Sequence, residues 1–134
     1  MLKPKVISQV LRQASTNGIN TALLMNAGGS LLAFAAPSDR EARIYAAIAA
    51  NLWSTYLKSS SSGAVFRNEG KEDELRLLIL PCEEGVVAIT APSTTMLVCL
   101  VGDKSVDLGL LKAKIEAVSR HLSEPLEKVA SYQQ

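Results

Sequence analysis

The sequence has few of the side chains from which catalytic and metal sites are built. Among 134 residues there is one histidine, His121, and there are two cysteines, Cys82 and Cys99, outside any C-x-x-C arrangement. Zinc sites need several such ligands at short spacings, and small secreted domains need a framework of paired cysteines. The sequence therefore disfavours both a zinc site and a disulfide framework, and we expect no metal. We expect both thiols to be reduced and buried in apolar strands.

Long apolar runs, an excess charge and nucleotide motifs are also missing. The net charge of +1 provides no basic footprint for nucleic acid. No run approaches the roughly 18 apolar residues of a membrane span, and the first residues lack a secretory apolar segment, so we expect a cytosolic chain without direct membrane insertion. Phosphate-binding loops, the dinucleotide fingerprint and the H-E-x-x-H motif are absent from the sequence, so we expect no cofactor.

One enzyme hypothesis remains open after these exclusions. It pairs Cys82 as a nucleophile with His121 as its base, and Glu83 or Glu84 would orient the base. A reactive thiolate needs an electropositive setting, whereas two acidic residues follow Cys82. We favour the alternative, in which Glu83 and Glu84 lie in a solvated turn and His121 is a structural residue beside the apolar stripe of the last helix. We therefore expect no enzyme activity.

The sequence does contain a helix that is apolar on more than one side. Ser38 and Glu41 have the spacing of a capping box, in which each side chain accepts a hydrogen bond from the other's backbone N–H. No charged residue occurs from 44 to 57. The apolar residues there form two rows, one of Ile44, Ile48 and Leu52 and the other of Tyr45, Ala49, Trp53 and Tyr56. A helix that covers one sheet needs a single stripe, so we expect a partner chain to cover the second face.

Apolar periodicity and turn residues predict the order helix, two strands, helix, three strands, helix. The expected helices are 4–14, 38–58 and 106–122, the last one stopped or kinked by Pro125, and the expected strands are 19–25, 30–36, 75–80, 86–90 and 95–101. Residues 96–101 are apolar at every position, which is typical of a central strand covered on both faces. The Ser-rich segment at about 58–73 is predicted to be a flexible loop within a single domain, residues 1–134.

Several segments resemble the roadblock/LC7 domain family, and within it the roadblock-type adaptor subunits of Ragulator (LAMTOR) complexes. The similar segments are VLRQA (10–14), LLMN (23–26), GSLLA (29–33), AIAANLW (47–53), EGVVAIT (84–90), LLKAK (110–114) and EPL (124–126). The resemblance spans nearly the whole chain and departs chiefly at 58–73 and 35–37.

The resemblance implies an α+β, profilin-like fold with a five-stranded antiparallel sheet between helices. It also implies that two domains pair through the middle helix and the adjoining edge strand, which joins their sheets into one of ten strands. We expect Ile48, Leu52 and Trp53 to carry this contact. The full set of expected interface residues is Ile44, Tyr45, Ile48, Ala49, Leu52, Trp53, Tyr56, Leu75, Leu77 and Ile79.

The function implied by the resemblance is that of a scaffold. Its partners would be a second, different roadblock subunit, a lipidated membrane-anchor subunit and Rag-type small GTPases, at the cytoplasmic face of the late endosome, lysosome or vacuole, in TORC1 and MAPK signalling. Two alternatives from the same fold stay open: a homodimeric roadblock regulator of a small GTPase, and a dynein light chain.

Overall fold

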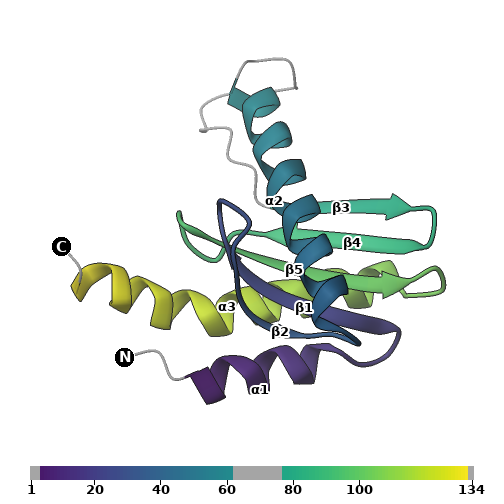
Figure 1. The fold of residues 1–134 in the computed structure, drawn as a ribbon, viewed down its shortest axis with the longest axis horizontal. Helices are drawn as coiled ribbons and strands as arrows, with labels where there is room; N and C mark the ends of the chain where they lie inside the picture. Colours follow the sequence, from purple (N-terminus) through teal and green to yellow (C-terminus); the bar gives the residue numbers. More distant parts are fainter. Residues whose placement is uncertain (1–3, 62–76, 133–134) are drawn as a thin grey trace.

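The computed structural model describes residues 4–61 and 77–132, which form three helices and one five-stranded antiparallel sheet (Figure 1). The predicted order of helices and strands is confirmed. The elements are α1 (Pro4–Ala14), β1 (Ile19–Asn26), β2 (Leu31–Ala35), α2 (Asp39–Ser61), β3 (Leu77–Cys82), β4 (Gly85–Thr90), β5 (Met96–Asp103) and α3 (Leu108–Tyr132).

The strands lie in the order β2-β1-β5-β4-β3, so β5 is the central strand, as its continuous apolar sequence predicts. Two segments far apart in the chain meet there, because β1 pairs with β5 and Ala22 lies opposite Leu100. The strands β1 and β2 lie on one side of β5, and the strands β4 and β3 lie on the other. The sheet consequently has two edges, β2 and β3.

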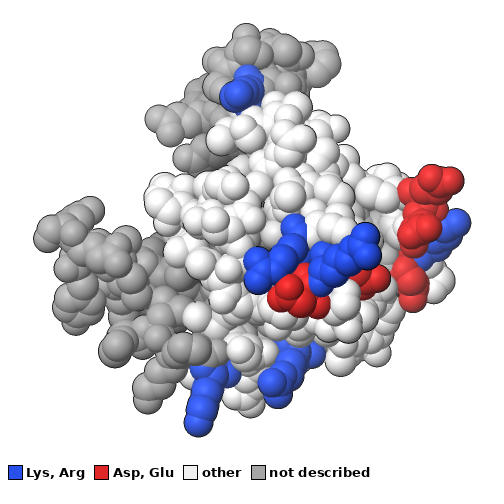
Figure 2. Space-filling view, viewed as in Figure 1, with Lys and Arg blue, Asp and Glu red and all other residues white. Residues whose placement is uncertain are grey.

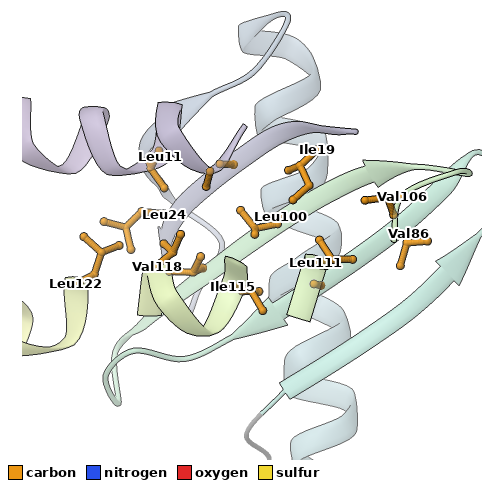
Figure 3. Packing of buried hydrophobic residues seen from close by; sticks show 14 residues of the cluster. Leu11, Ile19, Leu24, Val86, Leu100, Val106, Leu111, Ile115, Val118 and Leu122 are labelled. Carbon is orange, nitrogen blue, oxygen red and sulfur yellow. The ribbon is translucent and has the colours of Figure 1, made fainter. Parts of the chain in front are cut away.

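Helices cover both faces of the sheet, with α2 on one face and α1 with α3 on the other (Figure 1). Successive side chains of β5 point alternately to the two helix layers. Val98 and Leu100 pack with α1 and α3, whereas Leu97 and Cys99 pack with α2. Figure 3 shows Leu100 in the same cluster as Leu11 of α1 and Ile115 of α3, together with other buried aliphatic side chains. The sheet thus separates two apolar cores.

The turn between β1 and β2 is closed by the side chain of Asn26. Its Oδ1 accepts hydrogen bonds from the backbone N–H of Gly28 at 3.0 Å and of Ser30 at 2.9 Å. Gly29 has a φ of 96°, a conformation that favours glycine because it has no Cβ. This closure brings the hairpin onto the face beneath α2 and fits the turn predicted from the sequence.

Two predicted boundaries are wrong. Helix α3 continues past Pro125 to Tyr132, because proline removes one backbone donor but its φ is compatible with a helix. Helix α2 continues to Ser61, so the first residues of the expected loop at 58–73 are helical. The rest of that expected loop, and the expected interface residue Leu75, lie outside the described residues.

Candidate protein interface on α2 and β3

Helix α2 begins at the predicted cap. The hydroxyl oxygen of Ser38 accepts a hydrogen bond from the backbone N–H of Glu41 at 3.1 Å, which satisfies a donor that the first helical turn leaves free. The side chain of Arg43 donates to the carboxylate of Asp39 at 2.7 Å, one turn earlier. These charged and capping groups are confined to the start of α2, and the helix beyond them is free to present apolar side chains.

The inner face of α2 is built mostly from small residues. Ala42, Ala46, Ala49 and Ala50 are buried against the sheet, and Trp53 is only 7% exposed. Residues spaced by three and four share one side of a helix, and alanine side chains allow the helix axis to approach the strands closely. The structure therefore places Ala49 and Trp53 in the core of the chain and not on the outer surface where pairing was expected.

The outer face of α2 is apolar and accessible. Ile48 is 43% exposed, Ile44 is similarly exposed, and Leu52 one turn further is half-buried. These three residues are spaced by four and form one row along the helix. Tyr45 beside the row is half-buried and packs partly onto the core. Figure 2 shows that charged side chains gather around the start of α2, while the surface along its middle is uncharged.

The C-terminal turns of α2 extend past β3, the edge strand of the sheet (Figure 1). Leu57 follows Trp53 by one turn, so its side chain projects from the same side of the helix as the core residues. Leu57 is nevertheless 44% exposed, and Tyr56 is exposed to a similar extent. An exposed apolar side chain on this side of the helix, beyond the edge strand of the described sheet, is suited to contact with a strand supplied by another chain.

Strand β3 forms the second part of this surface, since one of its sides has no partner strand among residues 4–61 and 77–132. Its side chains alternate between the two faces of the sheet. Leu78 packs on the α2 side, whereas Leu77 and Ile79 pack against the core formed with α1 and α3. The side chains of Leu77 and Ile79, two of the expected interface residues, therefore lie on the face opposite α2, and their place in an interface stays a prediction. Leu80, which is half-buried and shares the side of Leu78, was missed, although the period of two along a strand would have identified it.

A cavity of about 280 Å³ lies beside the first turns of α2. Its lining includes Glu41 and Tyr45 of α2 together with Cys82 and Glu84 from the end of β3 and the following turn. The pKa of Tyr45 is raised by partial burial and, to a smaller extent, by the negative charges of Glu41 and Glu84. These groups are acidic or neutral, so the cavity offers no cation to activate a thiol.

The pair proposed in the enzyme hypothesis is not assembled. Cys82 is exposed and lines the cavity on the α2 side, which corrects the prediction that it is buried. Cys82 is exposed because it ends an edge strand. His121 lies on α3, which covers the opposite face of the sheet. Within 4–61 and 77–132, no three histidine, cysteine, aspartate or glutamate side chains are grouped closely enough to hold a metal ion.

The second thiol gives a test of the core. Burial raises the pKa of Cys99 from its ordinary value of 9.0 to about 12. Above about pH 9 the unfolded chain therefore ionises this thiol while the folded chain does not, and stability falls as the pH rises toward 12. We expect the wild-type protein to lose about 1 kcal/mol more than Cys99→Ala between about pH 9 and pH 10, measured by urea unfolding. Equal losses in the wild type and in Cys99→Ala would contradict the prediction.

No helix in the described part of the chain combines the length and apolar character needed to cross a membrane.

Comparison with known proteins agrees with this architecture. Residues 6–101 match the Roadblock/LC7 domain family. The chain is 32% identical over 130 residues to a Caenorhabditis elegans protein named Ragulator complex protein LAMTOR2 homolog, and the alignment covers 97% of each. The Roadblock/LC7 domain from Streptomyces avermitilis superposes with a TM-score of 0.77 at 11% identity, covering 90% of this chain and 97% of that one. Acanthamoeba castellanii profilin II gives 0.59 at 15% identity, covering 90% and 96%, so the predicted profilin-like fold is confirmed. The chain belongs to the Roadblock/LC7 domain family.

Proposed function

We propose that this chain is a non-enzymatic adaptor subunit that pairs with a second, different roadblock subunit in a Ragulator-like complex. The observation that supports pairing most directly is the apolar outer face of α2, which continues past β3, the edge strand of the described sheet. Ile48 is exposed at the middle of that face, and Leu57 is exposed beyond the sheet. Monomeric soluble proteins rarely leave such a contiguous apolar surface in water.

The geometry supports pairing by helix and strand together. A partner that adds a strand beside β3 would satisfy backbone donors and acceptors that have no partner strand in the described part of this chain. The same strand would lie beneath Leu57, while the partner's own helix would cover Ile44, Ile48 and Leu52. Such an interface would bury on the order of 1,600 Å² in total. Side chains at its centre would supply most of the affinity, because contacts there exclude water fully.

The choice of complex is supported by the relative named as a Ragulator complex protein, which aligns along nearly the whole chain. In this proposal, a lipidated membrane-anchor subunit holds the pair at the cytoplasmic face of the late endosome, lysosome or vacuole. The pair is a platform for Rag-type small GTPases in TORC1 signalling, and for MAPK signalling. The chain's role is to present surfaces, since its thiols and its histidine are not arranged for catalysis.

The experiment that tests this function is affinity purification of the tagged full-length protein from its own cells, followed by mass spectrometry. We expect a second small roadblock protein, a small lipidated protein and Rag-type GTPases to copurify. The tagged protein with Ile48→Asp, analysed in parallel, should lose the second roadblock protein. Recovery of dynein chains, or of a small GTPase together with only untagged copies of this chain, would overturn the proposal in favour of the two alternative functions of the same fold.

A further inference from the structure

Strand β2 is the edge of the sheet opposite β3, and its outer side has no partner strand among the described residues. Edge strands of natural proteins are usually protected by charged side chains or proline. Residues 31–35, LLAFA, contain neither. Leu32 is 51% exposed and Phe34 is 37% exposed. The strand therefore presents backbone hydrogen-bonding groups together with two large apolar side chains.

The two faces of β2 differ. Phe34 lies opposite Leu23, which is buried in the core beneath α2, so the Phe34 side chain is on the α2 side of the sheet. Ala33 and Ala35 are on the other side and pack against the core that contains α1. A strand added beside β2 would therefore place every second side chain next to Phe34 and the intervening ones on the side of α1.

The surroundings of β2 on the α1 side are basic. Helix α1 packs against β2 and contains Lys5 and Arg12 but no acidic residue. Both basic residues are exposed. Figure 2 shows basic side chains over α1 with no acidic side chains next to them. Acidic side chains on an added strand would thus be attracted to this edge, and basic ones would be repelled.

We propose that the β2 edge binds an extended segment of a partner polypeptide, which adds to the sheet as a sixth strand. Residues of this segment beside Phe34 are apolar, and residues that reach toward Lys5 and Arg12 are acidic. The backbone pairing supplies affinity, and the two rows of side chains supply specificity. This inference does not depend on the pairing through α2, because β3 and β2 lie at opposite edges of the sheet.

A second copy of this chain fits the same edge less well. Antiparallel pairing of two β2 strands would bring two α1 helices, each positively charged, to the same edge, and like charges there oppose association. The strand is also short, at five residues, and its pairing with β1 is irregular between Leu24 and Met25. Short, irregular edges limit self-association.

The test uses the full-length protein as bait for displayed random peptides of about twelve residues. We expect the selected peptides to alternate apolar residues and to be rich in aspartate and glutamate. Synthetic copies of the selected peptides should slow hydrogen exchange of backbone amides within residues 31–35. Binding, measured by isothermal titration calorimetry, should weaken about tenfold or more in the double variant Leu32→Glu, Phe34→Glu.

The matched control is Leu108→Glu, which places the same charge at an equally exposed leucine at the start of α3. It should leave the peptide affinity unchanged. Both mutated residues of the double variant are exposed, so the unfolding midpoint checks that it still folds. Phe34→Ala should also weaken binding, because it removes the aromatic contact without adding a charge. The proposal is overturned if no peptide is enriched, if the peptides protect other amides, or if they bind the double variant with wild-type affinity. If the backbone amides of residues 31–35 exchange more slowly as the protein concentration rises, without any peptide, the edge self-associates. That result would also overturn the proposal.

Discussion

Replacing Ile48 with aspartate is expected to abolish pairing with the second roadblock subunit while leaving the fold of this chain intact. Ile48 lies on the outer side of α2, away from the sheet, so the aspartate remains in water in the isolated chain. In the pair it would be a buried charge without a partner, which costs about 3 kcal/mol or more. The affinity should fall by about a hundredfold or more. Copurification and light scattering on the copurified pair measure this loss.

The matched control for Ile48→Asp is Val6→Asp. Val6 is another β-branched, exposed helical residue, but it lies on α1, which covers the opposite face of the sheet. We expect this variant to pair like the wild type and both variants to have circular dichroism spectra close to that of the wild type. Normal pairing by Ile48→Asp would show that the outer face of α2 is not the interface.

Replacing Leu100 with alanine should strongly destabilise the chain itself. Leu100 is fully buried in the middle of β5, where it packs with residues of α1 and α3 (Figure 3). Removing three buried carbon atoms there leaves a cavity that β5 cannot close, since it is hydrogen-bonded to β1 on one side and to β4 on the other. The free energy of unfolding should fall by about 2–5 kcal/mol.

Leu108→Ala provides the comparison for Leu100→Ala. It makes the same chemical change at a leucine that is half exposed, so the free energy of unfolding should change by less than about 0.5 kcal/mol. Urea unfolding of the three proteins at one pH and protein concentration measures both values. A loss below about 1 kcal/mol for Leu100→Ala would contradict the position of β5 in the centre of the sheet.

The order of helices and strands could be predicted because each segment has a clear local signal. Ser38 caps α2 as its spacing with Glu41 predicts, and the apolar run that begins at Met96 forms the central strand. The row of Ile44, Ile48 and Leu52 was also identified correctly as one face of a helix. In these cases residues close in sequence determine the structure, through capping, periodicity and burial.

The directions of individual side chains were harder to predict. Two apolar rows on a helix do not reveal which row faces the sheet, and the small alanines that follow Ala42 made the buried side look less apolar than it is. Trp53, which was expected to carry part of the pairing contact, lies on the buried row. For β3, Leu77 and Ile79 were named because the resemblance implies pairing through the edge strand. Every residue from Leu77 to Leu80 is apolar, so the strand contains no signal for which side chains face α2.

The pairing of β1 with β5 has a consequence for synthesis of the protein on the ribosome. Leu23 and Leu24 are made early, but the strand that lies beside them ends at Asp103, near the end of the chain. Such distant pairing is slow to form, because the intervening chain must first be ordered. During translation, β1 and the alanine side of α2 therefore remain exposed to water until β5 has emerged from the ribosome. We therefore expect the nascent chain to be prone to aggregation until β5 has been made.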